Sequence, residues 1–172
     1  TRLAVRLARE RGLTGFVRND TAGVQIEVQG DDAAVAGFMA YIQVPGLPGR
    51  PRLLEISRFE AKELLLTEGE AEFRIIQSDA AGDATAEVTP DTAVCAACLT
   101  EMNTPKDFRY RYPFITCTHC GPRYSIIKSI PYDRPNTTMA DFVLCDHCRR
   151  QYEDVADRRF HAQPVACPKC GP

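Results

Sequence analysis

Residues 103–120 read NTPKDFRYRYPFITCTHC, and residues 153–170 read EDVADRRFHAQPVACPKC. The two stretches align without a gap at an offset of 50 residues, and each ends in a C-x-x-C pair. The matched positions are Asp107 and Asp157, Arg109 and Arg159, Tyr110 and Phe160, Ile115 and Val165, Cys117 and Cys167, and Cys120 and Cys170. The C-terminal half is therefore expected to contain two copies of one small cysteine-bearing unit.

All eight cysteines fall in four C-x-x-C pairs, namely Cys95/Cys98, Cys117/Cys120, Cys145/Cys148 and Cys167/Cys170. The gap within each repeat is 18 residues, whereas 24 residues separate the two repeats. The equal gaps favour two sequential four-cysteine sites, and four thiolates suit Zn²⁺. An interleaved pairing and an iron–sulfur cluster are the alternatives. A zinc ion with four thiolate ligands has no open position, so both ions are predicted to be structural.

Each repeat is expected to close its own metal-held module, because so small a segment with modest apolar content needs such cross-links. Replacement of Cys117 with Ser should then unfold the first module and spare the second. His119 and His147 lie inside C-x-x-C pairs and are expected to be exposed. His161, in RRFHAQP, is expected to have a surface or packing role.

The composition of the 172-residue chain, 44% hydrophobic and 26% charged, is typical of a soluble globular protein. No apolar run approaches the length of a membrane span, and the start lacks the apolar core of a signal peptide. Paired rather than scattered cysteines favour metal binding in a reducing compartment, so we expect a cytoplasmic protein without a membrane partner. The chain opens directly in a helical pattern without Met, and we expect the natural N-terminus to lie further upstream.

The two halves differ in charge, with a net of −5 in residues 1–94 and +3 in residues 95–172. The small, polar stretch 78–91 separates them and is typical of a linker. We predict domains at 1–77, 95–144 and 145–172, with a linker at 78–94. DFRYRYPF, residues 107–114, alternates basic and aromatic residues, as nucleic-acid-binding segments do. Eight thiolates and two Zn²⁺ would contribute about −4, so we instead expect core aromatics and solvated arginines.

The first half reads α-β-β-α-β-β. Helices are predicted at 1–12 and 31–43, and strands at 14–20, 23–30, 52–64 and 70–78. The second helix has Asp31 or Asp32 as its cap and an apolar face of Val35, Phe38, Met39 and Ile42. One further strand before Thr1 would complete the β-α-β-β-α-β order of a ferredoxin-like sandwich. The predicted fold class is α+β, a ferredoxin-like sandwich without its first strand, followed by two small zinc-finger modules with four cysteines each.

GFVRNDTAG, residues 15–23, resembles the acylphosphatase signature. Together with YPFITCTHCGPRYSII, PYDRPNTTM and RRFHAQPVACPKCGP, the whole chain resembles the N-terminal part of the HypF family of carbamoyltransferases. The resemblance implies an acylphosphatase-like domain followed by two zinc fingers. It also implies nucleotide-binding and carbamoyl-transfer domains that are absent from this chain.

The resemblance further implies hydrolysis of carbamoyl phosphate, ATP use in the absent downstream domains, and transfer of the carbamoyl group to a cysteine of the maturation protein HypE. The group ends as a cyanide ligand of [NiFe]-hydrogenase. Asn19 matches the asparagine that orients the attacking water, although without the family it would read as a turn residue. The phosphate-binding arginine is expected before Thr1, so this fragment alone should be inactive. The alternative is a non-enzymatic zinc-ribbon module that binds RNA or a protein partner.

Overall fold

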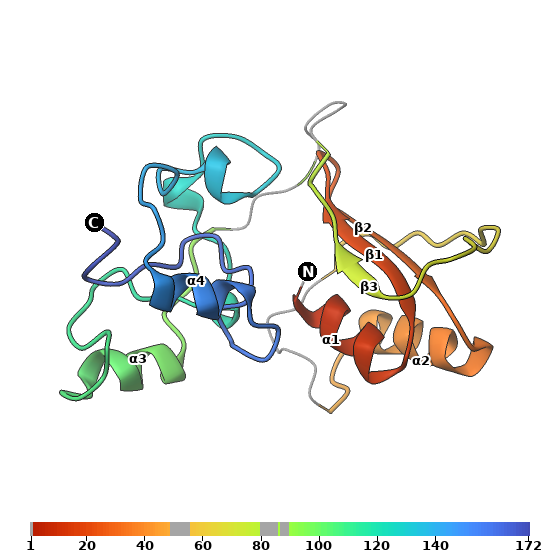
Figure 1. The fold of residues 1–172 in the computed structure, drawn as a ribbon, viewed down its shortest axis with the longest axis horizontal. Coiled ribbons are helices and arrows are strands. Elements are labelled where there is room, and N and C mark those ends of the chain that lie inside the picture. The colour runs from red at the N-terminus through yellow and green to blue at the C-terminus, as the bar shows by residue number, and fades with distance from the viewer. Residues whose placement is uncertain (1, 49–55, 80–85, 87–89) are drawn as a thin grey trace. The chain divides into compact units, whose positions relative to one another are not determined.

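The computed structural model describes residues 2–48, 56–79, 86 and 90–172 (Figure 1). The chain divides into two compact units. Residues 3–18 and 25–77 make the first, and residues 78–172 make most of the second, which also takes in residues 2 and 19–24. Among the described residues, no helix is both long and apolar enough to cross a membrane.

The first unit contains a sheet of three described strands in the order β2-β1-β3. They are β1 (Thr14–Asn19), β2 (Val24–Gln29) and β3 (Phe73–Ile75), and β1 pairs with β3 in parallel. Helices α1 (Arg2–Glu10) and α2 (Asp32–Gln43) lie on one side of this sheet in Figure 1. The buried side chains include Leu7, Val17, Phe38 and Phe73, one from each of four elements. The predicted α+β architecture of the first unit is therefore confirmed.

The second helix follows its sequence pattern closely. The Asp31 carboxylate accepts hydrogen bonds from the backbone N–H groups of Ala33 (3.0 Å) and Ala34 (3.3 Å), and so caps the helix. Phe38 and Ile42 are buried, while the other two residues of the predicted apolar face are half-buried. Capping and periodicity thus act together to fix this helix on the sheet.

Gly15 explains why β1 and β2 approach so closely. A Cβ at this position would lie 2.1 Å from the carbonyl oxygen of Glu27 on β2, and φ is +129°. Only glycine satisfies both conditions. Glycine at this position therefore permits the close approach of the two strands, and Asn19 ends β1.

The strand predicted at 52–64 is wrong for its described part. Residues 56–64 form no strand, and residues 52–55 lie outside the described residues. In a ferredoxin-like sheet the strand that precedes the first helix lies between this segment and β2, and the described residues include no such strand. A strand needs a neighbour for its backbone groups. Instead, the Gln29 side chain bonds to the backbone N–H and C=O of Thr67, at 2.8 and 2.9 Å.

Leu65 and Leu66 in this region are 95% and 78% exposed, and Val24 on the outer strand β2 is 56% exposed. Exposed apolar residues beside an unpaired strand edge promote association between chains. We predict that the 172-residue chain binds a hydrophobic dye and elutes partly as oligomers. A longer chain with a strand before α1 should do neither. Equal dye binding by both lengths would contradict this account.

The second unit carries the duplication in its backbone. Helices α3 (Ala96–Asn103) and α4 (Asp146–Glu153) begin at positions 50 residues apart. Arg111 and His161, also 50 apart, both have positive φ, at 57° and 51°. Their N–H groups donate to equivalent carbonyls, those of Met102 (2.8 Å) and Tyr152 (2.9 Å). The two copies therefore have the same local fold.

The segment between the repeats packs into the unit rather than leading away from it. It contains the short 3₁₀ helices η2 (Tyr124–Ile126) and η3 (Arg134–Asn136). The Arg134 guanidinium donates to the carbonyls of Gln163 (2.7 Å), Val165 (2.9 Å) and Phe142 (2.7 Å). This segment thus ties the second repeat to the residues that precede it. The domain boundaries at 77, 94 and 144 stay predictions.

One apolar core serves both repeats. Residues of the first repeat and of the connecting segment cluster with Ala166 of the second, and Cys170 packs against the same cluster. Gly171 shows how close the repeats are, because a Cβ there would lie 2.0 Å from the Tyr112 hydroxyl oxygen. The expectation of two self-contained modules therefore does not hold for packing.

Candidate metal centre

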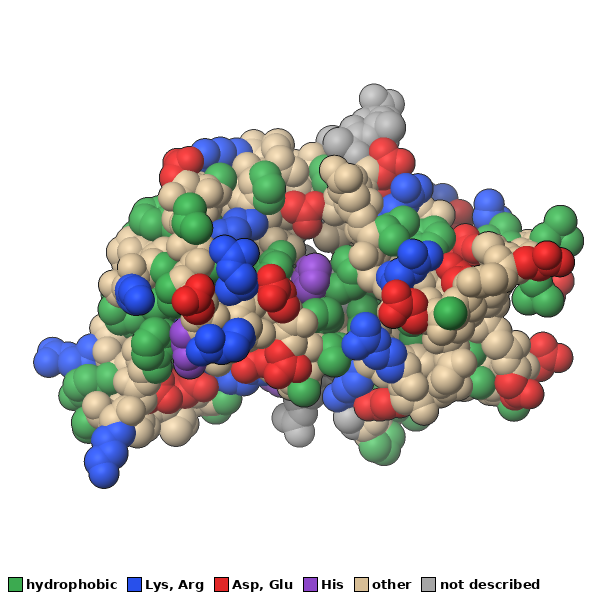
Figure 2. Space-filling model, viewed as in Figure 1, with side chains coloured by type: hydrophobic (Ala, Val, Ile, Leu, Met, Phe, Trp, Pro, Cys, Tyr) green, Lys and Arg blue, Asp and Glu red, His purple; other side chains and the backbone are tan. Residues whose placement is uncertain are grey.

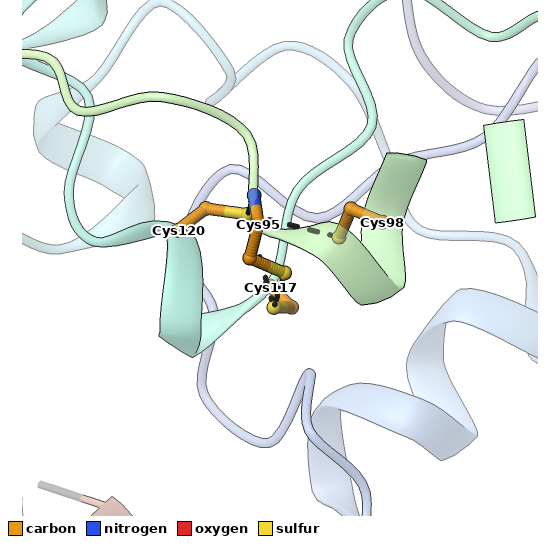
Figure 3. A group of neighbouring side chains, drawn as sticks. All are labelled: Cys95, Cys98, Cys117 and Cys120. Atoms are coloured by element: carbon orange, nitrogen blue, oxygen red, sulfur yellow. Dashed lines mark hydrogen bonds between the residues drawn. The ribbon is translucent and has the colours of Figure 1, made fainter. Parts of the chain in front are cut away.

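Each repeat presents its first cysteine pair at a helix start and its second in a tight turn. Cys95 is the N-cap of α3 and Cys98 lies in the helix's first turn, while Cys117 caps the 3₁₀ helix η1 (Thr118–Cys120). Figure 3 shows the four side chains converging, and the backbone N–H of Cys95 donates to the Cys120 sulfur at 3.3 Å. Helix N-termini stabilise negative charge, so this geometry favours thiolates.

The sulfur atoms are grouped sequentially, not in the interleaved way. One group is Cys95, Cys98, Cys117 and Cys120, and the other is Cys145, Cys148, Cys167 and Cys170, with all ligand atoms of a group within 4.8 Å of one another. Sulfur–sulfur distances of 3.6, 3.9 and 3.7 Å in the first group and 3.8 and 3.6 Å in the second are recorded. A tetrahedron with Zn–S bonds of about 2.3 Å requires about 3.8 Å. Both groups therefore fit a zinc ion, and none of the eight cysteines forms a disulfide.

The pKa values of these thiols determine how metal affinity depends on pH. A hydrogen bond to Cys117 raises the pKa of Cys98, and burial raises the pKa of Cys148. Burial opposes ionisation of Cys145 as well, but hydrogen bonds from the Cys148 backbone and neighbouring thiols outweigh it and lower its pKa to about 7. Metal binding must deprotonate the raised groups, so metal affinity should fall as the pH falls.

The three histidines stand outside both cysteine groups. His119 is exposed, as expected, whereas His147 is half-buried, with its ring 4.1 Å from that of Phe108. The His161 ring stacks on Tyr152 at 4.8 Å and meets Phe160 edge-on at 4.6 Å. Desolvation by this packing lowers the His161 pKa. A packing role for His161 follows.

Burial in DFRYRYPF, residues 107–114, differs in part from the expected core aromatics and solvated arginines. Arg109 is only 2% exposed, whereas the aromatics Phe108, Tyr110 and Phe114 are 46%, 40% and 54% exposed. Only Tyr112 of this stretch is a buried aromatic. On the face in Figure 2, basic side chains are interspersed with acidic ones and make no continuous basic surface. One of the two arginines in this stretch is therefore buried rather than solvated.

Two buried arginines, Arg109 and Arg159, and the half-buried Arg158 are functional candidates that sequence reasoning missed. Arg109 donates from Nη2 to the Cys148 sulfur at 3.1 Å, and Arg158 donates from Nη1 to the Cys98 sulfur at 2.9 Å. Arg159, 2% exposed, is bound by the Glu101 carboxylate. The repeat alignment of Arg109 with Arg159 contained a signal for burial, since two copies of an Asp-x-Arg turn suggest a shared structural role.

Asn19 lies at the end of β1, where the hairpin turn begins. The Asp20 carboxylate accepts hydrogen bonds from the N–H groups of Ala22 (2.8 Å) and Gly23 (2.7 Å), which closes the predicted turn at 19–23. The Asn19 carbonyl accepts from the Asp79 N–H at 2.9 Å. The backbone of Asn19 is thereby fixed on both sides, and its role in catalysis stays a prediction.

The chain combines two protein classes that family comparison identifies separately. Residues 1–75 match the acylphosphatase family, and residues 94–127 and 144–172 match the HypF finger. The fold and the cysteine groups thus define an acylphosphatase-like domain followed by a HypF-type finger pair. The chain is homologous to the N-terminal acylphosphatase and zinc-finger region of carbamoyltransferase HypF.

Relatives from distant organisms support this assignment. The chain is 48% identical over 166 residues to "Carbamoyltransferase HypF" of Rhodobacter capsulatus, covering 96% of this chain and 21% of that protein. It is 49% identical over 136 residues to the protein of the same name from Synechocystis, covering 79% of this chain and 17% of that protein. The chain therefore spans about a fifth of the length of these curated relatives.

Solved structures agree with the sequence comparison. A crystal structure of full-length HypF in the phosphate- and nucleotide-bound form matches with a TM-score of 0.88 and 42% identity, covering 99% of this chain and 22% of that chain. A crystal structure of T. kodakarensis HypF matches with a TM-score of 0.79 and 41% identity, covering 99% of this chain and 21% of that chain. Both the fold and the sequence are thus shared over nearly the whole chain.

We predict two zinc ions per chain and no iron–sulfur absorbance, because both sulfur groups have tetrahedral zinc spacing. Elemental analysis of the protein together with its visible spectrum checks this.

Calorimetric titration at neutral pH in buffers of different ionisation enthalpy should show proton release on zinc binding, since the Cys98 and Cys148 pKa values are raised. One ion per chain, or zinc affinity independent of pH, would contradict the assignment.

Proposed function

We propose that this chain is the N-terminal region of a carbamoyltransferase that uses carbamoyl phosphate, and that its first domain hydrolyses that substrate. The observation that carries the proposal is the joint occurrence, in one chain, of the acylphosphatase match and the HypF finger match. An acylphosphatase fold suits carbamoyl phosphate, because this substrate is itself a mixed anhydride of a carboxylic acid and phosphate.

In this proposal Asn19 orients the attacking water. Its side-chain amide can accept a hydrogen bond from water and donate one, which fixes the direction of attack. The hydrogen-bonded turn at Asp20 and the close strand approach at Gly15 support a fixed position for Asn19. A guanidinium from a loop before α1 would hold the phosphate through its fork of donors.

The released carbamate would pass to downstream domains of the longer protein. These domains would use ATP to activate it, and HypE would accept the carbamoyl group for cyanide synthesis in [NiFe]-hydrogenase maturation, within the cytoplasm. Homology to HypF over the first domain and both fingers supports this placement. The finger unit would connect the hydrolytic domain to those later domains.

The eight cysteines would hold two structural zinc ions in this protein. A zinc ion with four thiolates has no free coordination position, and it supplies a cross-link rather than a reactive centre. Three of the four ligands in the first group and two in the second are buried, which suits a closed site. The fingers would thus stabilise the unit and take no part in hydrolysis.

Hydrolysis of carbamoyl phosphate tests the proposal. The 172-residue chain should be nearly inactive, and a version extended upstream should be active. In the extended protein, Asn19→Ala should lower kcat by about 100-fold or more while phosphate inhibition is nearly unchanged, because the amide positions water and the arginine holds the anion. Asn103→Ala, at an exposed position on α3, is the matched control. Unchanged turnover of the Asn19 variant would remove that residue from the mechanism.

RNA binding tests the alternative of a nucleic-acid module. We predict only weak binding that disappears between low and physiological salt, because one arginine of DFRYRYPF is buried and the metal-loaded half is near neutral. Fluorescence anisotropy with a labelled single strand measures it. Submicromolar affinity at physiological salt would favour the non-enzymatic module.

A further inference from the structure

We infer that the two metal sites are coupled, so that zinc binding at one raises the affinity at the other. The reason is that each site contains a thiolate whose arginine donor belongs to the opposite repeat. The inference rests on the proposed zinc binding by the two cysteine groups. It concerns the arginines around the ions, which the assignment of the ligands leaves without a role.

At the second site the donor comes from the first repeat. The Arg109 guanidinium donates from Nη2 to the Cys148 sulfur (3.1 Å) and from Nε to the Ala166 carbonyl (2.8 Å), next to the ligand Cys167. The Asp107 carboxylate accepts from the Arg109 backbone N–H at 2.8 Å, which fixes the start of the side chain. Arg109 is therefore held at its base by its own repeat and at its tip by the other.

At the first site the donors come from the second repeat. Arg159 donates from Nε to the Thr116 carbonyl (3.1 Å), which mirrors the contact of Arg109 with Ala166. The sulfur contact is made by the neighbouring Arg158, whose Nη1 lies 2.9 Å from the Cys98 sulfur. The Thr118 N–H and hydroxyl bond back to the Arg158 carbonyl, at 3.0 and 2.9 Å. Each repeat therefore donates a hydrogen bond from one of its arginines to a cysteine sulfur of the other repeat.

Buried charge makes this crossing energetically significant. Hydrogen bonds from a guanidinium to a charged acceptor are stronger than neutral ones, and a buried charge without a partner is strongly destabilising. If the first repeat unfolds, Cys148 loses the Arg109 donor and Arg158 loses Cys98. If the second repeat unfolds, Arg109 loses Cys148 as its acceptor. Each folded, loaded repeat thus stabilises the other, and such coupling must act equally in both directions.

This coupling replaces the expectation that Cys117→Ser would spare the second repeat. The first test of the coupling uses the chain without any substitution. Native mass spectrometry of the metal-stripped 172-residue chain with one equivalent of zinc measures the species with no, one and two ions. Two independent sites would leave about half of the molecules or more with one ion, because unequal affinities only raise that share. We expect the one-ion species to be well below that share, with empty and doubly loaded chains dominating.

Arginine variants then test the crossing itself, with ¹¹³Cd NMR to resolve the two sites. Arg109→Met should lower affinity by about 10- to 100-fold and move the cadmium signal at the second site, although residue 109 lies in the first repeat. Arg158→Met should act in the same way on the first site. Arg149→Met, on α4 beside the ligand Cys148 but exposed, is the control and should change neither signal.

The outcomes separate the inference from the assignment on which it rests. A wild-type chain that binds no zinc would overturn zinc binding altogether. A chain that binds two ions with a statistical one-ion share would leave zinc binding intact and overturn the coupling. Arg109→Met acting only on the first site would overturn the crossed arrangement. A depleted one-ion species with crossed variant effects establishes it.

Discussion

Eight sulfur atoms, gathered into two groups, are the constraint on which the second unit depends. Thiolates carry negative charge, and five of these eight cysteines are buried. Such charge needs a cation at the centre and donors around it. The tetrahedral sulfur spacing meets the first need, and the arginines meet the second. In the proposed zinc-bound protein, cross-links through the two ions would hold together an irregular chain that has only two short helices and a small apolar core.

The duplication explains how the donors are supplied. Each repeat contains an aspartate that bonds to the N–H of an arginine two residues later, Asp107 to Arg109 and Asp157 to Arg159. Two copies of one local fold can exchange equivalent contacts, and both arginines reach the carbonyl before the third cysteine of the opposite copy. The same side chains that would be solvated in a single finger are thereby buried between two.

Local features could be predicted from the sequence, and features that depend on distant partners could not. The equal 18-residue gaps indicated how the sulfur atoms are grouped. The cap at Asp31 and the apolar periodicity of Phe38 and Ile42 indicated α2. Both predictions rest on short-range spacing along the chain. The described part of the predicted strand, residues 56–64, is not a strand, because pairing requires another strand beside it. Arg109 was expected in solvent because its acceptors, Ala166 and Cys148, lie some forty to sixty residues away.

The two sites differ in the charged residues that approach them. Two arginines, Arg158 and Arg159, approach the first site, and the carboxylate of Glu101 binds both. Burial alone would raise the Glu101 pKa, but the hydrogen bonds from Arg159 and Arg158 hold it below its usual value, so the carboxylate is charged. The aligned position in the second repeat is the uncharged Gln151, and at the second site Arg109 donates to the Cys148 sulfur. A further arginine, Arg134, is also near: burial lowers its pKa, and the charges of Cys170 and Cys148 oppose that shift. The copies have diverged in sequence at two linked positions. Arg158 stands where the first copy has Phe108, and Glu101, which pairs with Arg158, stands where the second copy has Gln151.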